Sequence, residues 1–267
     1  MAASAESAFV ALGNGAYRAT ALTRGPWNPE HQHAGPPIAL VAGEIERAAA
    51  ALDLRHIARL TANLLRPIPI SELSVAVQTE YAGRNVAHFA AQLVAEGKEV
   101  ARCTAVAQRE AAIGIPDGLP GHPLPVAPRP VEESPPARFP FSRERAGYQD
   151  LIESRVAQGT FFSGPCAAWI RMRYPLVAGE EPGPIQRVAV AADSGNGISS
   201  VLDFGRYVFV NSDLTINLLR RPQGEWICID AHTLIGPSGN GLAEARLFDR
   251  EGLVGRSTQS LPIRLRD

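Results

Sequence analysis

The string "LTANLLRP" at residues 60–67 returns almost unchanged as "LTINLLRRP" at residues 214–222. An offset of 154 residues aligns the two copies, and the same offset aligns further positions. These positions are Thr79 with Thr233, Val100 with Val254, and Arg102-Cys103-Thr104 with Arg256-Ser257-Thr258. Chance similarity does not keep a fixed register over such a length, so the chain is predicted to be an internal duplication.

A proline-rich segment separates the two copies. Nine prolines lie between Pro116 and Pro140, a density that excludes a helix or a central strand and favours an extended spacer. We therefore expect an N-terminal repeat over residues 1–112, a linker over 113–146 and a C-terminal repeat over 147–267. Each repeat has about the size of one small domain.

Each copy carries the signals of one helix followed by long strands. In the first copy, apolar residues from Ile38 to Leu52 recur at helical spacing behind Pro36-Pro37, which suit the first turn of a helix. Period-2 runs bounded by turn residues predict the strands. In the first copy they lie at 56–67, 72–81, 85–95 and 99–108, after one strand at 9–22; in the second they lie at 166–177, 207–220, 225–236, 241–250 and 253–265, with a helix near 186–193. This order predicts an α+β fold in which a curved antiparallel sheet wraps a helix in each copy.

Composition and charge exclude several classes of function. With 26 basic and 27 acidic residues, the chain has no net attraction to nucleic acid or to an anionic membrane. Neither a secretory signal nor a run of about 20 apolar residues is present, so we expect a cytoplasmic protein without integral membrane association. Three cysteines far apart indicate neither a disulfide framework nor a zinc site.

The pattern resembles the double hotdog fold, and within it the acyl-CoA thioesterase II group with the thioesterase-like proteins of actinobacteria. The stretches that carry the resemblance are "HAGPPIALVAGEIERA", "LLRP", "WIRMR", "NSDLTINLLRRPQGEW" and "GLVGRSTQSLPIR", in this order along most of the chain. The resemblance implies hydrolysis of an acyl-CoA to the free acid and CoA. It implies no metal and no other cofactor.

Polar residues present in only one copy point to the chemistry, because one copy of a duplication often becomes structural. Asp213 has Arg59 as its counterpart and Gln259 has Ala105, whereas Thr233 is matched by a threonine. In the family that the chain resembles, an Asp, a Thr or Ser and a Gln at these places hold the attacking water. We therefore expect the three side chains to converge at the seam between the copies, with Asp213 as general base and Thr233 and Gln259 as orienting groups. The structural alternative is a turn-forming aspartate and a solvated glutamine.

The helix of the first copy offers a site for the oxyanion of the reaction. Its N-terminus has unpaired N–H groups and the positive end of the helix dipole. The prolines at 36 and 37 cannot donate, which leaves the backbone N–H of Gly35, together with that of Ala34. His33 directly precedes this loop and is a candidate for substrate contact or proton transfer. Asp193, in "ADSGNG", ranks below Asp213 as the acid, because Asn196 and its neighbouring glycine are typical of a helix terminus.

Two further readings concern ligands and function. The "HQH" at residues 31–33 is a weak metal-ligand set and is interpreted as a pocket-lining loop. Besides thioester hydrolysis, the alternatives are a hotdog hydratase or dehydratase acting on an enoyl thioester, which needs a His with an acidic partner, and a protein that binds acyl thioesters without turnover. The expected small-molecule partner is an acyl-CoA. The long edge strands also make a homo-oligomer plausible.

Overall fold

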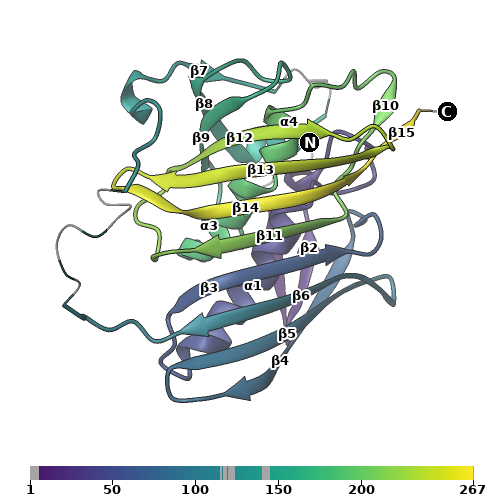
Figure 1. Ribbon diagram of the computed structural model, residues 1–267. Helices are drawn as coiled ribbons and strands as arrows, with labels where there is room; N and C mark the ends of the chain where they lie inside the picture. Colours follow the sequence, from purple (N-terminus) through teal and green to yellow (C-terminus); the bar gives the residue numbers. More distant parts are fainter. Residues whose placement is uncertain (1–5, 115, 117–118, 120–123, 140–144, 267) are drawn as a thin grey trace.

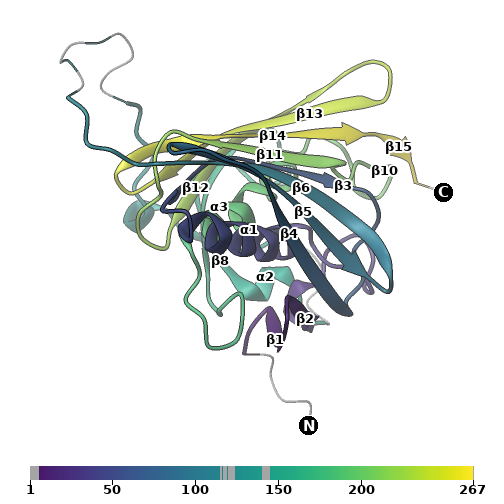
Figure 2. The same cartoon turned by 90° about the horizontal axis from the view of Figure 1, so that it is seen from below.

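A computed structural model describes residues 6–114, 116, 119, 124–139 and 145–266. Its centre is a curved antiparallel sheet with the strand order β1-β2-β4-β5-β6-β3-β11-β14-β13-β12-β9-β8-β7. The helices lie on the concave side of this sheet (Figures 1 and 2). The first half contains β1 Phe9–Gly13, β2 Ala16–Ala19, η1 Ala21–Thr23, α1 Gly35–Ala50, β3 His56–Leu64, β4 Glu72–Ala82, β5 Val86–Ala95 and β6 Lys98–Gln108. The remainder contains η2 Val131–Glu133, β7 Pro136–Ala137, α2 Tyr148–Leu151, β8 Ile152–Gln158, β9 Cys166–Met172, α3 Pro184–Ala192, α4 Gly195–Ile198, β10 Tyr207–Val208, β11 Asp213–Leu218, β12 Ile227–Ile235, β13 Asn240–Asp249, β14 Gly252–Pro262 and β15 Arg264–Leu265.

The two repeats join through the strands that carry the repeated string. β3 pairs antiparallel with β11, and Thr61 lies directly opposite Thr215. Their hydroxyl oxygens are 3.3 Å apart. Because these two threonines are equivalent in the duplication, an approximate twofold axis passes between them. The predicted double hotdog fold is thus confirmed, with one continuous sheet shared by both repeats.

The helix α1 forms the centre of the core. The first nine residues of α1, from Gly35 to Gly43, are all buried. The sheet of the first repeat covers one side of the helix and α3 packs along another. Gly43 permits this close approach, because a Cβ at that position would collide with the side chain of Gln186. Most buried apolar residues of both repeats therefore form one common hydrophobic cluster, and a smaller cluster lies around Trp169 and Trp226.

Several segments differ from the sequence prediction, among them β8, where no strand was expected. The strand expected over 9–22 is a hairpin of β1 and β2, because Asn14 and Gly15 adopt positive φ angles of 51° and 73° and turn the chain. The strand expected over 207–220 is divided into β10 and β11. Within the expected linker, β7 pairs with β8, and the carbonyl of Arg129 accepts a hydrogen bond from the indole of Trp169. The division at 112 and 147 stays a prediction.

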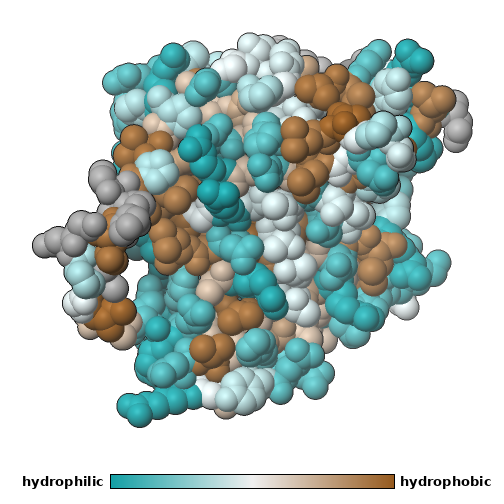
Figure 3. Space-filling view, viewed as in Figure 1, coloured by the Kyte–Doolittle hydropathy of each residue, from teal (hydrophilic) through white to brown (hydrophobic). Residues whose placement is uncertain are grey.

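The outer face of the sheet is mixed in polarity (Figure 3). An apolar group lies at the end of the β12–β13 hairpin, where Leu234, Ile235 and Leu242 are 54%, 39% and 39% exposed. A homo-oligomer that uses such a surface stays a prediction. In the described part of the chain, no helix is both long enough and apolar enough to cross a membrane.

Candidate functional site

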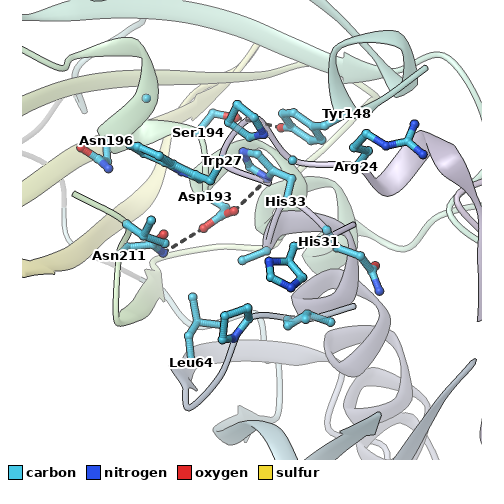
Figure 4. Close-up of a pocket in the computed structure, with 18 of the residues that line it drawn as sticks. Arg24, Trp27, His31, His33, Leu64, Tyr148, Asp193, Ser194, Asn196 and Asn211 are labelled. Carbon is cyan, nitrogen blue, oxygen red and sulfur yellow. Dashed lines mark hydrogen bonds and ion pairs between the residues drawn. The ribbon is translucent and has the colours of Figure 1, made fainter. Parts of the chain in front are cut away.

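A cavity of about 740 Å³ opens beside the N-terminus of α1. Residues of both repeats line it: the loop before α1, the segment that follows β3, and the end of α3 with the loop before β11. Figure 4 shows His33, Asp193 and Asn211 as a connected group in its wall. The cavity therefore lies at the seam between the repeats, where the sequence predicted the site.

Asp193 is the buried carboxylate of this cavity. It caps the C-terminus of α3, and its side chain is only 3% exposed. One oxygen, Oδ1, accepts hydrogen bonds from Asn211 Nδ2 at 3.0 Å and from Gln259 Nε2 at 3.3 Å. The other oxygen, Oδ2, lies 2.9 Å from His33 Nδ1. Every contact satisfies an acceptor, as a buried carboxylate requires.

His33 is held in place by an aromatic stack. Its ring lies 3.8 Å from that of Tyr148, at an interplanar angle of 7°. The Tyr148 hydroxyl donates to the carbonyl of Val190 at 2.7 Å and lies 2.8 Å from the Ser194 hydroxyl. Burial raises the pKa of Tyr148 well above its ordinary value, so the phenol remains a neutral donor. The imidazole plane is thereby fixed between Tyr148 and Asp193.

The Nδ1 atom of His33 has two neighbours. Besides the Asp193 oxygen at 2.9 Å, Nδ1 faces the backbone N–H of Gly35, which is directed at it from 3.2 Å. A ring nitrogen that donates its proton to a carboxylate cannot also accept one in the same plane, and the charge-assisted contact is the stronger. We assign the proton to Nδ1, which leaves Nε2 as an acceptor and the Gly35 N–H without a strong partner in the first turn of α1.

Gly35 also sets the distance between the two repeats. A Cβ there would lie 3.0 Å from the Val190 carbonyl oxygen and 3.4 Å from Asp193 Cβ. Both contacts are tight, so only glycine fits here without displacing α1 from α3. The predicted oxyanion donors, Gly35 and Ala34, thus lie next to the buried carboxylate, and Ala34 lines the cavity.

The structure brings Gln259 to the site, where its side chain contacts Asp193 rather than Asp213. Its Oε1 accepts from the Asn196 N–H at 2.9 Å, and its Nε2 donates to the Asp193 carbonyl at 3.2 Å. With 2% of its surface exposed, the Gln259 side chain supports Asp193 from behind. The alternative of a solvated glutamine is excluded.

Asp213 does not face the cavity. Along β11, the neighbouring Leu214 is fully buried in the core, so the alternation of the strand turns Asp213 to the outer face. There its carboxylate accepts from the Ser260 N–H at 2.6 Å. Thr233 binds a different partner, the Ser199 hydroxyl of the turn after α4, at 2.8 Å. The predicted convergence of Asp213, Thr233 and Gln259 is therefore wrong.

Two residues of the cluster were missed or ranked too low. Asn211 was not considered, and Asp193 was placed below Asp213. At the repeat offset they correspond to Ile57 and Ala39, so both pass the same test of asymmetry that selected Asp213. The "HQH" segment lines the cavity through its three residues, as expected. Among the described residues, no group of three or more His, Cys, Asp and Glu side chains could hold a metal ion.

Comparisons with known proteins show the family of the chain. A family model described as the acyl-CoA thioesterase N-terminal domain matches residues 23–108, and one described as the acyl-CoA thioesterase C-terminal domain matches residues 126–263. A search of curated proteins found no match.

Solved structures share the fold over nearly the whole chain. A protein of Novosphingobium aromaticivorans, provisionally described as a thioesterase, is 19% identical with a TM-score of 0.71 and covers 96% of this chain and 98% of its own. A hot dog protein of unknown function from Alicyclobacillus acidocaldarius is 15% identical, with a TM-score of 0.68 and coverage of 98% and 97%. The acyl-CoA thioesterase II TesB2 of Mycobacterium marinum is 17% identical, with a TM-score of 0.60 and coverage of 97% and 95%.

Proposed function

The chain belongs to the acyl-CoA thioesterase family and is a thioester hydrolase, and we propose that its cavity hydrolyses a fatty acyl-CoA or related acyl thioester to the free acid and CoA in the cytoplasm. The observation that carries this proposal is the His33–Asp193 pair in the cavity wall, at the N-terminus of α1. The pair combines a proton acceptor with a group that orients it, next to a helix terminus that stabilises negative charge.

Asp193 orients the base and His33 is the base. The oxygens of Asp193 already accept from Asn211, Gln259 and His33. With the proton on Nδ1, His33 Nε2 keeps a lone pair that can accept a proton. A water on Nε2 loses its proton to the ring as its oxygen bonds to the thioester carbon, and Asp193 stabilises the imidazolium that forms.

The N-terminus of α1 receives the oxyanion. When the carbonyl oxygen takes up negative charge, the Gly35 N–H and the dipole of α1 stabilise it. The tetrahedral intermediate then breaks its C–S bond, and the imidazolium returns the proton to the CoA thiolate. The products are one carboxylic acid and one CoA thiol, and the imidazole is regenerated neutral. Thr233 and Asp213 take no part in this scheme.

The same pair also favours a second function. A hydratase acting on an enoyl thioester needs a His with an acidic partner, and His33 with Asp193 meets that requirement. Membership of a thioesterase family favours hydrolysis. A binding protein without turnover has no use for a buried, oriented acid–base pair.

The test measures release of free CoA thiol from short, medium and long acyl-CoAs. The variant is His33→Gln, which keeps a donor for Asp193 but removes the base. The matched control is His31→Gln, a neighbouring histidine of the same cavity. We expect His33→Gln to lose roughly 10²- to 10⁴-fold in kcat and the control to keep its activity.

Hydration is followed in parallel through the loss of the enoyl-CoA absorbance. Addition of water without thiol release assigns the chain to the hydratase function. Absence of both reactions, with CoA thioesters still bound, assigns it to binding alone. Full thiol release by His33→Gln refutes the proposed base.

A further inference from the structure

Positively charged residues outnumber negatively charged ones in the lining of the cavity. Three arginines line it, namely Arg24, Arg66 and Arg145, and the carboxylate of Asp193 is the acidic group among the described lining residues. That carboxylate is buried and bound by its own partners. The rim of the cavity therefore carries an excess of positive charge.

The three guanidinium groups lack the carboxylate partners that arginines have elsewhere in this protein. Arg24 donates through Nε to the Pro29 carbonyl at 2.8 Å and through Nη1 to the carbonyl of Ala146. Arg145 is exposed and makes no hydrogen bond or ion pair with any residue that the structure describes. By contrast, carboxylates pair with many arginines away from the cavity: Arg18, Arg47, Arg102, Arg171, Arg220, Arg246 and Arg250.

Arg66 shows the difference most clearly. It lies next to Glu99, yet its Nη1 donates to the backbone carbonyl of that residue. The Glu99 carboxylate is occupied by Arg102, which binds it with two bonds of 2.8 and 2.7 Å. Arg66 therefore makes no direct hydrogen bond to any carboxylate that the structure describes. The hydrogen bonds from Arg102 lower the pKa of the Glu99 carboxyl, and Arg66 helps to lower it only through its charge.

The arginines come together from separate parts of the chain. Arg24 ends the short helix η1, and its carbonyl accepts from the Tyr148 N–H at 2.9 Å, so the segment with Arg145 lies beside it. Arg66 follows β3, and the Gln32 N–H donates to the nearby Ile68 carbonyl at 2.8 Å. Figure 4 places Arg24 beyond His33 and Tyr148, on the side away from Asn211. Arg24 thus lies on the far side of the His33 ring from the Asn211 amide.

We propose that Arg24, Arg66 and Arg145 form the subsite for the phosphate groups of CoA. The inference rests on the proposed function, since it assumes that the substrate is a thioester of a phosphorylated carrier. Guanidinium groups bind phosphate oxygens in pairs of parallel hydrogen bonds, and they are weakly hydrated. When the phosphates bind at the rim, the pantetheine arm extends into the cavity and carries the thioester carbon to His33.

The test compares binding of free CoA, which needs no turnover. The variant Arg66→Gln/Arg145→Gln removes two charges from the rim, whereas Arg24 is kept because its two carbonyl contacts hold loops together. The matched control, Arg18→Gln/Arg250→Gln, removes the same charge from exposed positions that do not line the cavity. Calorimetry is expected to show that the rim variant binds CoA roughly 10- to 100-fold more weakly than the wild type, whereas the affinity of the control is nearly unchanged. The affinity of the wild type for CoA should also fall steeply as the salt concentration rises.

Kinetic measurements test the phosphate subsite separately from the proposed function. For an acyl-CoA, the rim variant is expected to raise KM with kcat retained. For the same acyl group on pantetheine without phosphate, KM is expected to be equal in variant and wild type. Equal CoA affinity in the rim variant and the wild type overturns the subsite even if hydrolysis proceeds. Failure of the wild type to hydrolyse any thioester, with CoA bound through the rim, overturns the function and leaves the subsite standing.

Discussion

Replacement of Asp193 by asparagine tests the proton assignment at the centre of the site. In the wild type, Oδ1 faces two amide donors, Asn211 Nδ2 and Gln259 Nε2, and Oδ2 faces His33 Nδ1. An asparagine has one oxygen and one NH₂ group. Its oxygen must turn to the two donors, because the reverse orientation sets NH₂ against NH₂. The new Nδ2 then donates to His33 Nδ1, which forces the ring proton to Nε2.

The expected loss follows from this inverted tautomer. With a proton on Nε2, His33 cannot take one from water, and the variant lacks the negative charge that stabilises an imidazolium. General base catalysis contributes roughly 10²- to 10⁴-fold, so the activation free energy should rise by about 3–5 kcal/mol. Stability should change by less than ~1 kcal/mol, since each buried donor keeps a partner.

The assay measures kcat from thiol release, together with thermal unfolding of the same samples. Asp213→Asn is the matched control, because it makes the same change on the outer face of β11, where the carboxylate accepts from Ser260. We expect the control to stay within about twofold of the wild-type rate. An Asp193→Asn protein that folds and keeps its rate would refute the tautomer argument, and a strong loss in the control would restore Asp213 as the general base.

Further predictions concern the helix N-terminus, a buried ion pair and a residue assigned to structure. Gly35→Ala should lower kcat roughly 10- to 100-fold with little change in KM, because the added Cβ displaces the oxyanion donor; an unchanged kcat contradicts the donor assignment. Asp249→Asn should cost about 2–4 kcal/mol of unfolding free energy in urea at neutral pH, because it leaves the guanidinium of Arg220 without its carboxylate. Burial alone raises the pKa of Asp249, but hydrogen bonds from Arg220 and two backbone N–H groups outweigh it and lower the pKa. The difference from wild type should therefore persist above about pH 4 and disappear as the pH falls through the lowered pKa, and a difference that grows in acid contradicts this sign. Thr233→Val should reduce stability by about 1 kcal/mol through the lost bond to Ser199, with kcat within about twofold; a loss of activity would return Thr233 to the site.

The fold was predictable from the sequence because duplication and periodicity both constrain backbone placement. The repeated string predicted the duplication, which appears in the structure as β3 paired with β11, and the apolar spacing behind Pro36-Pro37 predicted α1. The hairpin at Asn14 and the division of β10 from β11 were not predicted, since single turn residues inside an alternating run leave its period almost unchanged.

The site was only partly predictable because asymmetry between the copies does not report side-chain direction. Asp213 passes the test of asymmetry, but its neighbour Leu214 is apolar and turns inward, which sends Asp213 outward. The alternation of polar and apolar residues is present in the sequence "SDLTINL". The contacts of Asp193, in contrast, depend on how α3 ends against α1. They are set by long-range packing at Gly35, which no local pattern records.

The approximate twofold axis implies a second position equivalent to the cavity, at the N-terminus of α3. There the helix N-terminus is closed by the protein itself. The Gly183 N–H donates to Gln186 Oε1 at 2.7 Å, and a Cβ at Gly183 would collide with the carboxylate of Glu46. At the first position, the residues just before α1, His33 and Ala34, line a cavity instead. The duplication thus yields one composite site, in which the first copy supplies the histidine and the helix N-terminus and the second supplies the carboxylate with its amide partners.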